Sequence, residues 1–182
     1  MLFRSQIGIR SCLNMLRART KFLSGHMMTE IASLLAPGAV TAGGHMTTAK
    51  ALFQHLGQVA EREYGLPAME VVDRLTERER LGSTGFGGGV AIPHGKMDGL
   101  DHVVGIFVQL AEPVDVKAID DLPVDLVFCL LSPPDAGSEH LKALAQASRW
   151  LRDRAFVAKL RGAGSADAIY ALFAASQTRD AA

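Results

Sequence analysis

A chain of 182 residues, of which 48% are hydrophobic, is long enough to bury one core of ordinary domain size. Its 19 basic and 19 acidic residues cancel, but five basic residues and no acidic one lie in residues 1–27, so the remainder carries a formal charge of −5. This acidic balance argues against nucleic acid as a partner, because proteins that bind the phosphate backbone need the opposite sign.

The two cysteines, Cys12 and Cys129, are far apart and form no CxxC pair, so neither a disulfide framework nor a zinc knuckle is indicated. This use of cysteine is typical of a reducing compartment, so we expect a cytoplasmic protein. No apolar stretch is long enough to span a membrane, and we expect no membrane insertion.

Residues 1–27 form a basic extension that lacks the continuous apolar core of a secretory signal. Met27 and Met28 offer alternative starts, so we interpret this extension as poorly ordered, or as a cloning remnant or an over-extended gene start. We expect residues 28–176 to form one domain and residues 177–182 to form a tail.

The first predicted element is a short helix in MTEIASLLAPG, capped by Thr29 and stopped at Pro37–Gly38, with a loop over AVTAGGH. A longer helix is predicted over TTAKALFQHLGQVAEREY, where apolar residues recur at helical spacing, and Gly65 ends it. Pro67 occupies the first position of a third helix, PAMEVVDRLTERER. Its expected buried stripe is Met69, Val72 and Leu75.

The sequence period then becomes that of strands. GVAIPH, HVVGIFVQL and PVDLVFCLL are apolar runs typical of buried strands, and EPVDVKAID alternates as a shorter strand near a sheet edge would. Ser138 is expected to cap a helix over EHLKALAQASRWLRD, and two closing helices follow, the last capped by Ser165. The buried side of the first of these three helices is expected to hold Leu141, Leu144, Ala145 and Leu151.

The order of helices, strands and helices predicts an α/β fold. We expect a single mixed β-sheet of about five strands, flanked by helices on both sides.

The segment GSTGFGGGVAIPHGK, residues 82–96, places six glycines in fifteen residues. It does not fit the Walker loop, because Gly89 and Gly95 are separated by five residues rather than four. It does not fit the dinucleotide fingerprint either, because Val90 stands where the third glycine should be. Nucleotide binding is therefore not supported, and we expect no cofactor.

A metal site is the next possibility, since His94, His102, His140 and Cys129 could converge. The chain has no HExxH motif and no short paired spacing of such ligands, so we expect no bound metal. Cys129 lies in an apolar strand, where a buried, inert thiol is the usual outcome.

The remaining interpretation makes the His94 imidazole the reactive group. A neutral imidazole nitrogen is a nucleophile toward phosphorus, and the pKa of histidine leaves much of it neutral near pH 7. Phosphoryl transfer mainly demands positioning and dispersed positive charge, which glycine-rich backbone can present as bare N–H groups. We therefore expect a phosphate-binding loop made of Ser83, Thr84, Gly85, Gly87, Gly88 and Gly95.

The segment LTERERLGSTGFGGGVAIPHGK resembles the active-site segment of the enzyme IIA component of bacterial phosphotransferase systems. It is most similar to the fructose/mannitol type (type 2) in its nitrogen-regulatory form, and the resemblance runs from about residue 29 to residue 174. It implies a phosphohistidine at His94, a second histidine at His140 and a functional arginine at Arg78. The pair Asp120–Asp121 departs slightly from the family pattern.

Two of these roles also follow from chemistry. His140 lies near the start of a predicted helix, where free N–H groups favour an anion, and its ring can donate a hydrogen bond to a phosphoryl oxygen. Arg78 can supply a fixed charge or a two-pronged contact to phosphate. The residues leave open which nitrogen of His94 is phosphorylated.

The resemblance implies that an HPr-like phosphocarrier donates phosphate to His94. It also implies regulatory target proteins whose binding depends on the phosphorylation state. Two alternatives stay open: a sugar-delivery IIA that passes phosphate to a IIB domain, and a binding-only regulator without relay activity.

Overall fold

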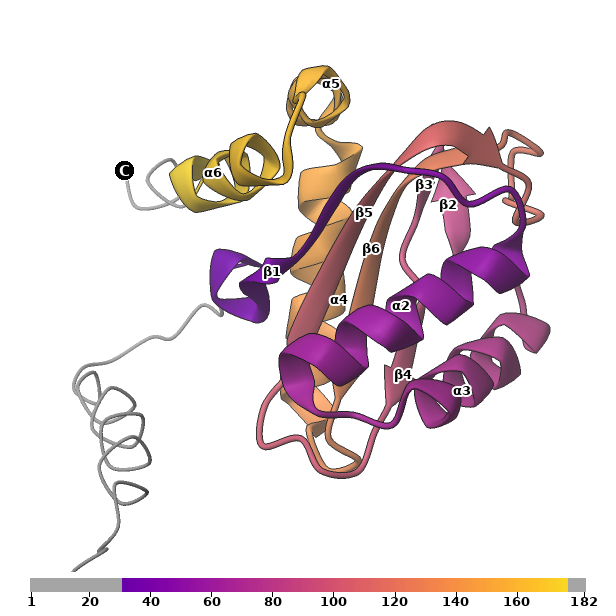
Figure 1. Cartoon of the computed structure of the whole chain (residues 1–182), viewed down its shortest axis with the longest axis vertical. Helices are drawn as coiled ribbons and strands as arrows, with labels where there is room; N and C mark the ends of the chain where they lie inside the picture. The colour runs from indigo at the N-terminus through magenta and orange to yellow at the C-terminus, as the bar shows by residue number, and fades with distance from the viewer. Residues whose placement is uncertain (1–30, 177–182) are drawn as a thin grey trace, which may run out of the picture.

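The computed structural model describes residues 31–176, which form one mixed sheet of six strands with helices on both faces (Figure 1). The expected extension over 1–27, the Thr29 cap and the tail over 177–182 lie outside the described residues. The strands are β1 (Leu35–Gly44), β2 (Gly85–Gly87), β3 (Val90–Ala91), β4 (His94–Lys96), β5 (Val104–Val114) and β6 (Val124–Ser132).

The strand order is β1-β5-β6-β3-β2, and β4 pairs with β6 beyond β3. The long strands β5 and β6 run antiparallel at the centre, and β1 pairs with β5 in parallel. Strands β3 and β4 both run parallel to β6, one after the other along the same edge. Because of this arrangement, His94 lies beside β6, where it pairs with Leu130.

Two layers of helices cover the two faces of the sheet, as the sequence predicts. Figure 1 shows α2 (Ala49–Tyr64) and α3 (Ala68–Arg80) on one side and α4 (Gly137–Arg152) on the other. Helices α5 (Arg154–Gly162) and α6 (Ala166–Ser176) belong to the layer of α4. Strand β5 is buried on both faces, which explains its continuous apolar run.

Two expectations for this region are wrong: the first short helix does not continue to Pro37–Gly38, and AVTAGGH is a strand up to Gly44 rather than a loop. Residues Ile31–Leu34 form a 3-10 turn, η1, and β1 follows at once and includes Pro37. Strand β1 is an edge strand of the sheet, where a proline, which has no N–H, is tolerated. Its pairing with β5 is irregular between Leu35 and Val40, and the Tyr64 hydroxyl fills this gap. That hydroxyl donates to the Gly105 carbonyl at 2.7 Å and accepts from the Ala36 N–H at 3.2 Å.

The short edge strand expected over EPVDVKAID is also wrong. Strand β5 continues to Val114, and the chain then forms a loop up to β6. Lys117 and Asp121 have φ angles of 55° and 56° in this loop, which an extended strand does not allow. The Asp120 carboxylate supports the loop by accepting from the backbone N–H groups of Gly88 and Leu122.

The helices are where the sequence places them, but two buried faces are rotated. In α3 the buried residues are Val71 and Leu75, whereas Met69 is 68% exposed. The apolar residues of this helix offer two overlapping stripes, and the one that includes Val71 packs into the core cluster shared with α2. Gly65 ends α2 with a φ of 70°, and Ser165 accepts from the Ala168 N–H, as predicted.

Helix α4 packs through small residues, Ala143 and Ala147, together with Leu151. Leu141 is instead 66% exposed and Ala145 is exposed, contrary to the prediction. Ser138 does not cap this helix, because the helix already begins at Gly137. Among residues 31–176, no helix is both long and apolar enough to cross a membrane.

Candidate active site

His94 is the first residue of β4, and its half-buried ring is held on both nitrogens. Nδ1 lies 2.9 Å from the Ile92 carbonyl oxygen, and Nε2 lies 2.9 Å from Nε of Arg78. A guanidinium can only donate, so Nε2 must be the acceptor. The ring proton therefore lies on Nδ1 and is donated to Ile92. This leaves the lone pair on Nε2 as the nucleophilic electron pair of the neutral ring.

Arg78 lies in the last turn of α3, where its Nη1 also donates to the Gly82 carbonyl at 2.8 Å. This second contact fixes the guanidinium across the end of the helix. Burial lowers the pKa of His94 below its ordinary value, and the Arg78 charge lowers it further, against an opposing effect of the Ile92 hydrogen bond. The site therefore favours the neutral, nucleophilic form of His94 near pH 7.

His140 lies in the first turn of α4, and its ring centroid is 5.6 Å from that of His94. Its Nδ1 is 2.8 Å from the Ser132 hydroxyl oxygen at the end of β6. Burial lowers the pKa of His140, and the neighbouring His94 and Lys96 add to this effect. The fold thus brings two histidines that are far apart in the sequence onto one site.

An open pocket of about 610 Å³ surrounds these rings. Three cationic side chains line it, and the Lys96 ammonium donates to the Pro134 carbonyl at 2.8 Å. Two carboxylates partly offset this charge, and Arg74 pairs with one of them, Glu77, at 3.4 Å. With three cations against two carboxylates, the lining of this pocket suits a ligand that carries two negative charges. The lining residues are Arg74, Glu77, Arg78, Leu81, His94, Gly95, Lys96, Asp98, Pro134 and His140.

Of the predicted site residues, His94, His140, Arg78 and Gly95 meet at this pocket, and Ser83 and Thr84 do not line it. The Thr84 N–H and hydroxyl both donate to the Glu79 carboxylate, at 3.0 and 2.7 Å. The Ser83 hydroxyl donates to the Val116 carbonyl at 2.8 Å. The Thr84 side chain therefore bonds to the end of α3, and the Ser83 side chain bonds to the loop after β5.

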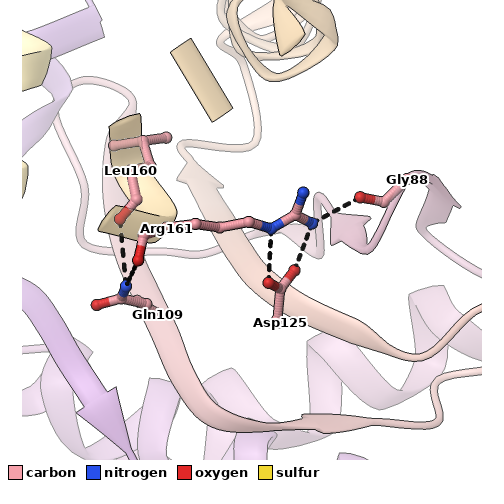
Figure 2. Close-up of polar contacts among 5 residues, drawn as sticks. All are labelled: Gly88, Gln109, Asp125, Leu160 and Arg161. Carbon is pink, nitrogen blue, oxygen red and sulfur yellow. Dashed lines mark hydrogen bonds and ion pairs between the residues drawn. The ribbon is translucent and has the colours of Figure 1, made fainter. Parts of the chain in front are cut away.

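The other loop glycines, Gly85, Gly87 and Gly88, also lie outside the pocket wall. Gly87 and Gly88 have φ angles of 106° and 66°, which side-chain-bearing residues rarely adopt. The Gly88 N–H donates to Asp120 at 2.9 Å, and its carbonyl accepts from Arg161 at 2.7 Å (Figure 2). The positive φ angles of this turn account for glycine at positions 87 and 88.

Three contributors to the site were not predicted from the sequence: Arg74, Lys96 and Ser132. Lys96 stands within the PHGK motif, and its place two residues after His94 on a strand is a usable signal. Arg74 lies one helical turn before Arg78, on the same face of α3. Ser132 carries no local signal, because it is simply the last residue of an apolar run.

The described part of the chain contains no group of three His, Cys, Asp or Glu side chains that could hold a metal ion. Cys129 is buried in β6, and burial raises the pKa of its thiol. This thiol is therefore protonated and packed within the core.

Comparison with known proteins shows the family to which the chain belongs. The family described as "Phosphoenolpyruvate-dependent sugar phosphotransferase system, EIIA 2" matches residues 33–176. A nitrogen regulatory protein of Bradyrhizobium diazoefficiens is 43% identical over 144 residues, covering 79% of this chain and 94% of that protein. One from Escherichia coli K12 is 36% identical over 142 residues, covering 78% and 87%.

The solved structures agree with this placement. The crystal structure of nitrogen regulatory protein IIA-Ntr from Neisseria meningitidis matches with a TM-score of 0.74 at 36% identity, covering 79% of this chain and 98% of that one. The chain therefore belongs to the EIIA type 2 family of the phosphoenolpyruvate-dependent sugar phosphotransferase system, a family of phosphotransfer proteins, in its nitrogen-regulatory form.

Proposed function

We propose that this protein is a cytoplasmic phosphohistidine relay that accepts a phosphoryl group from an HPr-like carrier on Nε2 of His94. The observation that carries the proposal is the hydrogen bonding of His94. Its Nδ1 proton is committed to the Ile92 carbonyl, and its Nε2 lone pair faces a guanidinium and a second imidazole.

In the proposed step, the Nε2 lone pair of His94 attacks the phosphorus atom of the carrier's phosphohistidine. The nitrogen–phosphorus bond of the carrier breaks as the new bond forms, and its electron pair returns to the carrier's imidazole, which leaves as a neutral ring because its other nitrogen carries a proton. The Nδ1 proton of His94 stays on the ring throughout, so the phosphorylated ring carries a positive charge. Arg78 gives up its bond to Nε2 and donates instead to a phosphoryl oxygen.

The surrounding charges fit the product of this step. A phosphoryl group carries up to about two negative charges near pH 7 and offers several strong acceptor oxygens. Arg78 and Lys96 line the pocket, and His140 can add a ring N–H. We infer that these side chains hold the phosphoryl group until it leaves.

We propose that the main purpose of the relay is regulation of target proteins rather than delivery of sugar phosphate. The support is the resemblance to nitrogen regulatory proteins over most of the chain. Phosphorylation would add negative charge to the pocket, and a target that binds this face would respond. The alternative, sugar delivery through a IIB domain, uses the same His94 chemistry.

The test is phosphorylation of the purified chain with phosphoenolpyruvate, enzyme I and the nitrogen-type carrier. Wild type should acquire acid-labile, base-stable label. His94→Ala should acquire none, and His102→Ala, an exposed histidine outside the pocket, should label normally. Unlabelled wild type would support a binding-only regulator, and label retained in His94→Ala would remove His94 as the acceptor. Onward transfer to an added IIB domain would favour sugar delivery.

A further inference from the structure

The hydroxyl of Ser132 is in an unusual position for a polar group. Ser132 is the last residue of β6, and its side chain is fully buried, with 0% exposure. Its oxygen lies 2.8 Å from Nδ1 of His140, and among the described residues this is the only hydrogen-bond partner of the hydroxyl. Its backbone carbonyl is used separately and accepts from the Met97 N–H at 2.8 Å.

The direction of this hydrogen bond follows from burial. If Nδ1 of His140 carried the proton, it would donate to the serine oxygen, and the hydroxyl proton would then have no acceptor. A buried donor without an acceptor loses its hydrogen bonds to water with nothing to replace them, which is destabilising. The hydroxyl therefore donates to Nδ1, and the single proton of the neutral ring lies on Nε2. Burial also lowers the pKa of His140, which favours the neutral ring.

We infer that Ser132 is a positioning residue that fixes His140 as the Nε2–H tautomer. In an imidazole ring Nδ1 and Nε2 lie on different edges. With Nδ1 against buried Ser132, the Nε2–H is directed away from β6, and His140 lines the open pocket.

The two histidines of the site are then opposite tautomers. His94 is protonated on Nδ1 by its bond to Ile92, and His140 is protonated on Nε2 by its bond to Ser132. One ring offers a bare nitrogen to phosphorus, and the other offers an N–H to a phosphoryl oxygen. The consequence for transfer rests on the proposed function, whereas the tautomer itself does not.

The experiment is long-range ¹H–¹⁵N correlation spectroscopy of the imidazole rings in the uniformly ¹⁵N-labelled full chain near pH 7.5. In wild type, His140 should show a protonated Nε2 and a bare Nδ1, and His94 should show the reverse pattern. In Ser132→Ala, the nitrogen shifts of His140 should move toward averaged values, because both tautomers become accessible. Ser132→Thr, which keeps the hydroxyl, should restore the wild-type pattern.

Ser138→Ala is the matched control, because it removes an exposed hydroxyl two residues before His140 and should leave the spectrum unchanged. A wild-type His140 that is protonated on Nδ1 would overturn the inference. So would a Ser132→Ala spectrum identical to wild type. If Ser132→Ala fails to fold, the wild-type and Ser132→Thr spectra still decide the tautomer.

A second measurement separates this inference from the proposed function. The rate of phosphoryl transfer from the carrier should fall roughly fivefold in Ser132→Ala, the factor that corresponds to ~1 kcal/mol. The rate in Ser138→Ala should not change. If wild type is never phosphorylated but the tautomers are as described, the relay proposal fails and the role of Ser132 stands. If wild type is phosphorylated and His140 is protonated on Nδ1, the reverse holds.

Discussion

His94 is prepared for nucleophilic attack by the contacts of its two nitrogens. The Ile92 carbonyl accepts a hydrogen bond from Nδ1–H on one side of the ring, and Arg78 donates to the Nε2 lone pair on the other. A cation beside a neutral imidazole discourages protonation of that imidazole. In the proposed relay, the same cation would stabilise the dianionic phosphoryl group on His94.

The first prediction concerns this cation. Replacing Arg78 with Gln should raise the pKa of His94, because the Arg78 charge is one of the causes that lower it. The pKa is measured by NMR titration of the ring protons. Arg80→Gln is the control, since Arg80 is exposed on the same helix and does not line the pocket. A His94 pKa that is unchanged by Arg78→Gln would show that the guanidinium does not act on the ring.

At this scale the sequence predicts His94, His140 and Arg78 as a group, because they lie in motifs with a recognisable chemistry. It does not predict Ser132 or the Ile92 carbonyl. A buried serine at the end of an apolar strand has many possible uses, and a backbone carbonyl has no sequence identity. Both depend on how β4 pairs with β6, which is a property of the folded sheet.

Tyr64 joins three elements, because its hydroxyl at the end of α2 bonds to both β1 and β5. It takes the place of a strand-to-strand hydrogen bond where the pairing of β1 with β5 is irregular. Burial raises the pKa of this phenol to about 12, so it remains a donor at all ordinary pH values.

The second prediction follows from this contact. Tyr64→Phe should lower the free energy of unfolding by about 1 kcal/mol or more, because it removes both hydrogen bonds of the hydroxyl and leaves the part-buried Ala36 N–H without this partner. Urea unfolding measures the change. In Tyr170→Phe the change should be smaller than about 0.5 kcal/mol, since the Tyr170 hydroxyl makes no hydrogen bond within the described residues. Equal losses in both variants would contradict a specific role for Tyr64.

Arg161 links α5 to the tight turn at Gly87 and Gly88 through a hydrogen bond to Gly88, as Figure 2 shows. It makes a two-pronged contact with the Asp125 carboxylate, at 2.6 and 2.7 Å, and donates to the Gly88 carbonyl. The next residue, Gly89, has a φ of 81°, and a Cβ there would lie 2.6 Å from Arg161 Nη2.

The third prediction is that Arg161→Ala loosens this turn. Hydrogen exchange of the backbone amide of Gly88 should become faster, and the free energy of unfolding should fall by about 1 kcal/mol, a modest loss because the ion pair is partly exposed. The comparison is Lys159→Ala, which removes an exposed cation from the same helix. Unchanged exchange at Gly88 would mean that Asp120 alone holds the turn.

At the scale of elements, the sequence predicts α2 to α6 and the two central strands, because their periodicity is strong. It fails at β1, where Pro37 and Gly38 are typical of a turn but lie within a terminal strand. It fails again after Val114, where the alternation of apolar residues continues into a loop that Asp120 supports. In both segments contacts with distant parts of the chain outweigh local preference.

At the scale of the molecule, three part-buried histidines among residues 31–176, His55, His94 and His140, have pKa values below the ordinary value of 6.5. Between that value and their lowered pKa, the unfolded chain binds more protons than the folded chain. The free energy of unfolding therefore falls as pH falls through about 6.5.

The fourth prediction is a loss of stability between pH 7.5 and 5, measured by urea unfolding. The exposed carboxylates of Asp115 and Asp120 have pKa values lowered below 3.8, so their own effect begins at more acidic pH and does not obscure this window. The double variant His94→Gln/His140→Gln should show a smaller loss than wild type. A free energy of unfolding that does not change across this range would contradict the lowered pKa values.

A single strand, β6, positions both imidazole rings. His94 pairs with its residue Leu130, and His140 is anchored to its last residue, Ser132. The distance between the rings is thus set when the sheet forms, once for each molecule, and no closing lid has to rebuild it at every turnover. A fixed pair of this kind adds little reorganisation energy to the reaction. In the proposed relay, this fixed geometry would keep the barrier low both when the phosphoryl group is taken up and when it is released.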